Sequence, residues 1–197
     1  KLWNDDVRSG NTREALKKSL ENLGLDYVDL YLIHWPAEGY VEAYLEMEKL
    51  QKEGLTRSIG VSNFRKSHLQ NLLSKVHIVP SINQIETNPQ MVDEETIQYC
   101  KENKIGVEAW SPLGSGACLN NPKIQEIANK YQKSSAQIIL RWLLQKGIVI
   151  LPKSVHENRI KENIDLFNFV LENEDVELIN QLNQHKRTGP DPDNFDF

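Results

Sequence analysis

The chain has 197 residues, of which 39% are hydrophobic and 26% charged, and its formal net charge is −5. This composition is typical of a globular protein, and mild acidity argues against a nucleic-acid footprint or an anionic membrane surface, which need concentrated basic charge. No apolar run approaches the ~20 residues that span a bilayer. No signal peptide opens the chain. We therefore expect a cytoplasmic protein with no nucleic-acid or membrane partner.

The two cysteines, Cys100 and Cys118, are too few for a disulfide framework or a metal cluster, so we expect no metal and a reducing compartment. The length predicts one domain over residues 1–197. The first residues lack an initiator Met and are apolar at once. The sequence is therefore expected to begin inside a structural element, with residues missing upstream.

Short β-branched or apolar runs alternate with amphipathic helical stretches, a pattern typical of consecutive βα units on a parallel sheet. In chain order, we predict strands at residues 27–35, 58–62, 81–86, 106–110 and 147–151. Residues 1–3 are predicted to be the end of a sixth strand.

Helix boundaries are marked by capping residues, prolines and glycines. Asn11 with Glu14 predicts a capping box for a helix that Gly24 ends. A second helix is expected over residues 40–53. Later starts are predicted where Asn121 precedes Pro122 and where Ser134 is followed by Gln137. Two further helices are expected around residues 158–166 and 175–182, before an Asp-, Pro- and Gly-rich tail.

Six βα units are compatible with a doubly wound sheet or with part of an eight-stranded barrel. A doubly wound dinucleotide fold normally carries a G-x-G-x-x-G turn, and this sequence has none. A complete barrel typically needs ~250 residues, which leaves this chain about two units short at its N-terminus. The missing start and the missing units agree, so the barrel is favoured.

Catalytic residues of such barrels lie at the C-terminal ends of the strands. The predicted strands end in residues 1–4, 34–36, 62–64, 84–86, 110–115 and 153–154, which are rich in polar and aromatic side chains. Each has an alternative structural interpretation: His34 as a buried structural histidine, Trp110 as core, and Ser62 with Asn63 as a helix cap. Only their joint placement indicates a site.

Six motifs occur in the order and spacing found in aldo-keto reductases, and the sequence resembles a bacterial-type member of that family over essentially its whole length. The motifs are Ile33-His34-Trp35-Pro36, Ile59-Gly60-Val61-Ser62-Asn63-Phe64, Asn83-Gln84-Ile85-Glu86, Ala109-Trp110-Ser111-Pro112-Leu113-Gly114, Pro152-Lys153-Ser154 and Arg159-Ile160-Lys161-Glu162-Asn163.

The resemblance implies an α/β fold of the TIM-type (β/α)8 barrel class, of which this chain supplies about six strands. It also implies NADPH-dependent reduction of aldehydes or ketones by hydride transfer. Trp110 matches the aromatic that stacks on the nicotinamide. Ser62, Asn63 and Gln84 match the groups that bind its carboxamide. The rest of the implied NADPH/NADP+ site comprises Ser111, then Leu113 and Ser115 along the pyrophosphate, Lys153, Ser154 and Arg159 at the 2′-phosphate, and Glu162 and Asn163 at the adenine.

One part of this assignment also follows from charge alone. Two cations, Lys153 and Arg159, and the hydroxyl of Ser154 lie at a strand end and the following helix start, where exposed N–H groups favour anions. The alternative is that both cations are solvated loop residues.

The reaction centre is only partly present. Lys1 and His34 match the family's catalytic lysine and histidine, but the acid tyrosine and its aspartate belong to strands upstream. Tyr40 and Tyr44 are expected to lie on the helix that follows His34. We therefore expect a reductase as the parent protein and weak or no carbonyl reduction by these 197 residues. The alternative is a non-catalytic NADPH-binding barrel module.

The small-molecule carbonyl substrate is not specified by the sequence. Trp3 and Trp35 are predicted to wall an apolar substrate pocket. Phe195 and Phe197 either fold over its mouth or belong to a frayed terminus. A monomer is the default expectation.

Overall fold

The computed structural model describes residues 1–197 and contains five parallel strands in the order β1-β2-β3-β4-β5. They are β1 (Val28–Ile33), β2 (Thr56–Ser62), β3 (Ile82–Glu86), β4 (Gly106–Trp110) and β5 (Val149–Ile150). The α/β prediction is confirmed. The predicted sixth strand is reduced to a single bridge between Leu2 and Ile33, because Asn4 already begins a helix. The fifth strand is shorter than predicted.

Nine α-helices and one 3₁₀ helix connect or follow these strands. They are α1 (Asn4–Ser9), α2 (Thr12–Leu23), α3 (Tyr40–Lys52), α4 (Lys66–Leu73), α5 (Glu94–Glu102), the 3₁₀ helix η1 (Gly114–Asn120), α6 (Pro122–Tyr131), α7 (Ser135–Gln145), α8 (Glu157–Ile164) and α9 (Asn173–Asn180). No helix combines the length and the apolar character that a bilayer crossing requires.

The chain divides into two compact units, and the division passes through β3 and the start of β4. The first unit comprises Lys1–Gln84, Glu95–Gly106 and Asp191–Phe197, and the second comprises Ile85–Glu94 and Val107–Pro190. The single domain over residues 1–197 stays a prediction.

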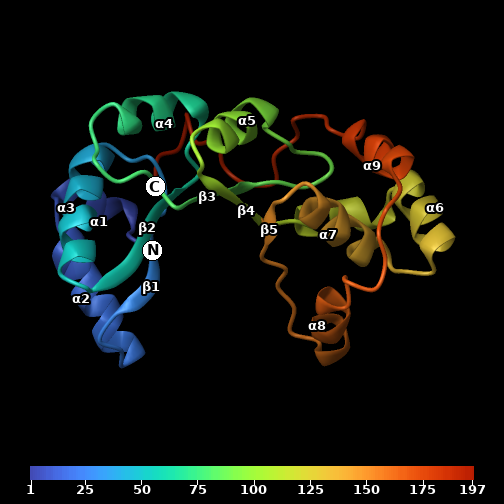
Figure 1. Cartoon of the computed structure of the whole chain (residues 1–197), viewed down its shortest axis with the longest axis horizontal. Coiled ribbons are helices and arrows are strands. Elements are labelled where there is room, and N and C mark those ends of the chain that lie inside the picture. The colour runs from blue at the N-terminus through green and yellow to red at the C-terminus, as the bar shows by residue number, and fades with distance from the viewer. The chain divides into compact units, whose positions relative to one another are not determined.

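In the first unit, α2 and α3 pack beside β1 and β2 (Figure 1). Parallel register pairs Val28 with Thr56 and Ile33 with Val61. The core between helices and strands is closed by fully buried apolar side chains, among them Leu16, Tyr44, Met47 and Ile59. Gly60 is required by close approach, since a Cβ there would lie 2.6 Å from the Ile82 carbonyl oxygen.

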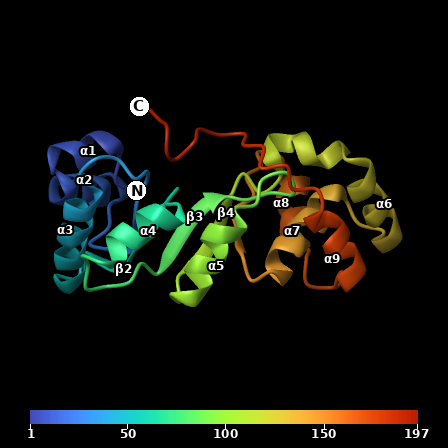
Figure 2. The same cartoon turned by 90° about the horizontal axis from the view of Figure 1, so that it is seen from above.

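In the second unit, α7 is the central helix. Figures 1 and 2 show it among α6, α8 and α9, and its Trp142 and Leu143 are completely buried. The predicted helix starts are confirmed here. The side chain of Asn121 accepts hydrogen bonds from the N–H groups of Lys123 and Ile124, and Ser134 with Gln137 forms a capping box.

One predicted cap is wrong. Asn11 precedes α2, but its side chain makes no capping hydrogen bond, because its φ of −87° and ψ of 29° depart from the extended conformation that presents a cap. Gly24 ends the same helix as predicted, with a left-handed φ of 65°.

Candidate functional site

In the first unit, the ends of three adjacent strands bring together four of the predicted residues. His34 follows β1, Ser62 ends β2 with Asn63 after it, and Gln84 lies in β3, where it pairs in register with Ser62. The Ser62 hydroxyl and the Asn63 N–H both donate to the Gln84 carbonyl, at 2.8 and 2.9 Å. The Asn63 amide donates to the His34 carbonyl at 3.0 Å. These bonds tie the three strand ends into one polar cluster.

The backbone of Asn63 has the left-handed φ of 64°, which asparagine tolerates better than most residues. This turn directs the chain from β2 toward α4 while the Asn63 side chain stays 4% exposed. Ser62 and Gln84 are also buried. The cluster therefore has the fixed orientation that recognition of a planar amide requires.

Burial lowers the pKa of His34 to about 4, and the positive charge of the Lys1 side chain adds to the effect. The imidazole is therefore neutral at neutral pH, with one ring nitrogen able to donate and the other to accept a hydrogen bond. Lys1 lies in the same cluster, because its Nζ donates to the Gln84 Oε1. The structure thus brings the predicted pair Lys1 and His34 together with the predicted carboxamide group.

Aromatic side chains enclose one side of His34. The Trp3 ring meets it edge-on with a centroid distance of 5.0 Å, and the Trp35 ring lies 6.5 Å away. Phe195 and Phe197 pack on Trp35 at 5.2 and 5.3 Å. The tail therefore folds over these tryptophans and is not frayed. Trp3 and Trp35 thus both lie beside His34, and their role as the wall of a substrate pocket stays a prediction.

Salt bridges hold this tail on the first unit. The Arg65 guanidinium pairs with Asp191 at 3.0 Å and also with Asp193. The carbonyl of Phe197 accepts hydrogen bonds from Asn4 at 2.9 Å and Arg8 at 3.0 Å. These contacts could not be predicted from the sequence, since charge pairs so far apart in the chain have no local signature.

In the second unit, Trp110 ends β4 and is followed by a tight turn into η1. Ser111 and Ser115 both have left-handed backbones, with φ of 49° and 53°. The Ser115 N–H donates to the Ser111 hydroxyl at 3.1 Å. Gly114 starts η1 with a positive φ of 58°, and a Cβ there would also meet Cys118 Sγ at 2.8 Å, so both the backbone and the available space favour glycine. The predicted pyrophosphate segment is therefore a compact loop with exposed hydroxyl groups.

A cavity of about 310 Å³ contains most of the remaining predicted residues. Its lining comprises Leu113, Leu119, Ser134, Ser135, Ala136, Lys153, Ser154, Arg159, Glu162 and Asn163. Six of these were predicted from sequence as cofactor-binding residues, and they come from the turn before η1, the segment after β5, and α8. The other four were not predicted, because nothing in the sequence shows that the start of α7 closes the cavity.

The charges of this cavity suit an anion. Neither Lys153 nor Arg159 forms a salt bridge, although 15 other pairs do. Both lie next to the N-terminus of α8, whose residue before the first turn, His156, gives no side-chain cap. The Ser154 hydroxyl accepts the His156 N–H at 3.1 Å. Two cations without carboxylate partners at a helix start form a fitting site for a phosphate group, so the donor set fits the 2′-phosphate of NADPH.

On the opposite wall of the cavity, the Ser134 hydroxyl donates to the Glu162 carboxylate. The same hydroxyl accepts the Gln137 N–H at 3.2 Å as the cap of α7. Glu162 is thereby fixed at the cavity, within one turn of Arg159 on the same helix. Asn163 lines the cavity beside it.

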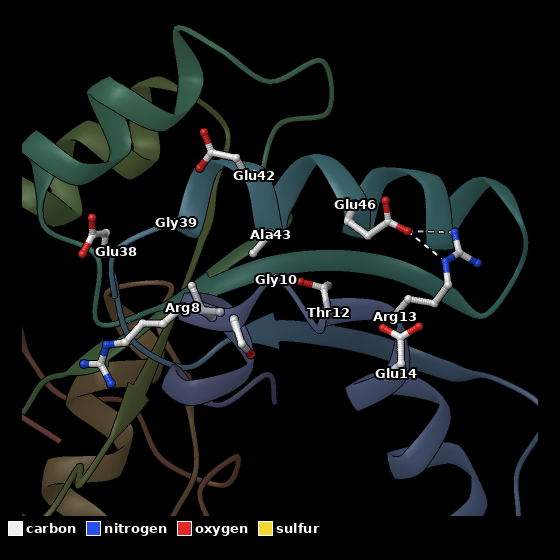
Figure 3. Close-up of a pocket in the computed structure, with 12 residues that line it drawn as sticks. Arg8, Gly10, Thr12, Arg13, Glu14, Glu38, Gly39, Glu42, Ala43 and Glu46 are labelled. Atoms are coloured by element: carbon white, nitrogen blue, oxygen red, sulfur yellow. Dashed lines mark hydrogen bonds and ion pairs between the residues drawn. The ribbon is translucent and has the colours of Figure 1, made fainter.

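The largest cavity described here, about 760 Å³, is a different one and contains none of the predicted residues (Figure 3). It is lined by the end of α1, the start of α2 and the first half of α3. Its Arg13 is neutralised by Glu46 and Glu53, and its Arg8 pairs with Asp5 and the Phe197 carbonyl. No group there is positioned for carbonyl or phosphate chemistry.

No hydrogen bond or ring contact joins a tyrosine to His34. Tyr31 and Tyr44 are buried with unpartnered hydroxyl groups, and burial raises the pKa of both. Tyr40 lies on α3 as predicted and accepts from Asn71 at 2.5 Å. Tyr27 contacts Arg57, and Tyr131 donates to Asp175. Tyr99 lies on α5.

Comparison with known proteins gives one consistent answer. The model of the aldo/keto reductase family matches residues 1–184. The uncharacterized oxidoreductase YtbE of Bacillus subtilis is 52% identical over 198 residues, covering 100% of this chain and 71% of that protein. Glyoxal reductase from the same bacterium is 49% identical, with 100% and 72% covered.

Solved structures agree. A Bombyx mori aldo-keto reductase crystallised in complex with NADP superimposes with a TM-score of 0.90 at 41% identity, covering 98% of this chain and 69% of that one. At this identity and coverage, both the fold and the sequence relationship are established. The chain belongs to the aldo/keto reductase family.

Proposed function

We propose that the protein to which these residues belong reduces aldehydes or ketones with NADPH. The carrying observation is the cavity of the second unit, where two unpaired cations, Lys153 and Arg159, lie at a helix start beside Ser154. This donor set recognises a phosphate. A phosphate on the adenosine ribose distinguishes NADPH from NADH, and the cavity therefore supports NADPH as the preferred cofactor.

The substrate proposed is a small carbonyl compound, with glyoxal as the first candidate, since a glyoxal reductase is 49% identical to this chain. When bound, NADPH supplies a hydride. Neutral His34 donates a hydrogen bond that orients and polarises the carbonyl oxygen. Trp3 and Trp35 provide the apolar wall beside it.

The remaining roles are binding roles. Ser62, Asn63 and Gln84 would hold the carboxamide and so determine which face of the nicotinamide is presented, because rate depends on near-attack geometry. The indole of Trp110 would stack on that ring. Ser111, Leu113 and Ser115 would lie along the pyrophosphate, and Glu162 with Asn163 would contact the adenine.

A second candidate is a non-catalytic NADPH-binding module. It is favoured by the contacts of the tyrosines within residues 1–197, since no tyrosine hydroxyl contacts His34. On this basis we propose that these 197 residues bind NADPH and turn over carbonyls weakly or not at all.

Titration with NADPH, followed by tryptophan fluorescence, tests the shared part of both candidates. The loss of NADPH absorbance with glyoxal then separates them. We expect saturable NADPH binding by the chain, and His34→Gln should retain binding while removing any residual turnover. Absence of NADPH binding would overturn both candidates. Binding without oxidation, even when the chain is part of its full-length protein, would favour the module.

A further inference from the structure

Glu86 ends β3 in the second unit and is 2% exposed, yet it has no role in the proposed chemistry. Its carboxylate accepts hydrogen bonds from a segment about a hundred residues further along the chain. Oε1 accepts the Thr188 N–H at 2.7 Å and the Thr188 hydroxyl at 2.5 Å, and Oε2 accepts the Gly189 N–H at 3.3 Å. Three donors on one buried carboxylate fix this backbone firmly.

The fixed segment lies directly against Trp110. A Cβ on Gly189 would approach the indole Cη2 to 2.4 Å and Cζ3 to 3.2 Å, so the glycine backbone rests on the far edge of the ring. Only a residue without a side chain fits at this separation. The position of the indole is therefore restricted by a backbone segment that Glu86 holds in place.

The same segment reaches the neighbouring loop. The Thr188 hydroxyl lies 3.5 Å from the Ser111 hydroxyl, which accepts the Ser115 N–H. A continuous chain of contacts thus runs from Glu86 through Thr188 to the turn after Trp110. Both the ring and the turn that follows it depend on one carboxylate.

We propose that Glu86 is a positioning residue, which acts through Thr188 and Gly189 to fix the Trp110 indole in the orientation that receives the nicotinamide. This inference rests on the proposed function for the nicotinamide itself. It gives Glu86, Thr188 and Gly189 a role in orienting the indole. We call Glu86, Thr188 and Gly189 together the clamp. Its loss should weaken binding of the nicotinamide and leave binding of the 2′-phosphate unchanged.

The experiment compares NADPH with adenosine 2′,5′-bisphosphate, which lacks the nicotinamide. Because truncation of buried Glu86 could unfold the chain, the variants are Gly189→Ala, Thr188→Val and Glu86→Gln. Thr87→Val is the matched control, since the Thr87 hydroxyl is equally buried, lies next to Glu86 and has no hydrogen-bond partner. Thr188→Ser, which restores a hydroxyl, is the rescue variant.

Gly189→Ala should raise the Kd for NADPH about tenfold and Thr188→Val about threefold to tenfold, with Glu86→Gln in between. The Kd for the bisphosphate should stay unchanged in all three, Thr87→Val should change neither, and Thr188→Ser should recover most of the affinity. Equal losses for both ligands, or no loss in Gly189→Ala, would overturn the assignment, because the clamp would then be only structural or irrelevant.

A second readout needs no ligand. Four tryptophans give four indole N–H resonances in a nitrogen-15 spectrum, and Trp110→Phe identifies the one from Trp110. Thr188→Val and Glu86→Gln should shift or broaden that resonance, while Thr87→Val leaves it in place. If the unmodified chain fails to bind NADPH, the proposed function fails, and this resonance still decides whether Glu86 holds the indole. An unchanged resonance would refute the clamp.

Discussion

Removal of the two cations in the second-unit cavity should abolish the preference for NADPH over NADH. Lys153 and Arg159 line the cavity and form no salt bridge, so neither substitution breaks an ion pair within the protein. A hydrogen bond to a charged group contributes about 1.5–3 kcal/mol, and the exposure of both side chains favours the lower value. Each alanine variant should therefore weaken NADPH binding about tenfold, and the double variant about a hundredfold.

The assay is a fluorescence titration with NADPH and with NADH, which lacks the 2′-phosphate. Affinity for NADH should change less than twofold or so. Lys161→Ala is the matched control, because Lys161 lies on α8, pairs with Glu157 at 2.7 Å and does not line the cavity. The reasoning is refuted if both cofactors lose affinity by the same factor, or if Lys161→Ala has the effect of Arg159→Ala.

Two further predictions concern stability. Because the folded-state pKa of His34 is lowered to about 4, the unfolded chain binds its proton first as the pH falls, and the free energy of unfolding should decrease between about pH 6.5 and 4. After discounting for solvent screening of a half-buried ring, the loss is about 1–2 kcal/mol; urea unfolding of His34→Gln should lack this part of the pH dependence, and parallel curves would contradict it. Gly60→Ala should lose about 2–3 kcal/mol, since its new Cβ would lie 2.6 Å from a backbone oxygen of β3; an unchanged urea midpoint would show that the strands can separate at no cost.

The strands and the strand-end residues could be predicted from sequence because their signals are local. The parallel runs ending in His34, Ser62 and Trp110 combine β-branched cores with polar ends, and four of the five strands have close to the predicted bounds. Caps with short reach, such as Ser134 with Gln137, were also predictable. The cap predicted at Asn11 is wrong because capping also depends on the backbone conformation, which the residue types alone do not determine.

The contacts that the sequence could not predict join residues far apart in the chain. Glu86 stands in a motif, but its partners Thr188 and Gly189 lie in a segment that composition alone described as a polar tail. The cavity wall from Ser134 to Ala136 was read only as the beginning of a helix. In both cases the local structure could be predicted from sequence. The contacts that each segment makes could not, because they depend on which distant segment packs against it.

The packing of the tail on the first unit affects the order in which contacts form during folding. The bond from Asn4 to the Phe197 carbonyl joins residues 193 positions apart in the chain, and the Phe195 and Phe197 rings cover Trp35 only when this segment has docked. Contacts of such long range form late, because the entropy of closing the loop must be overcome first. Until then, Trp3 and Trp35 have no aromatic cover, so a nascent chain would hold an open hydrophobic surface beside His34 that chaperones can engage.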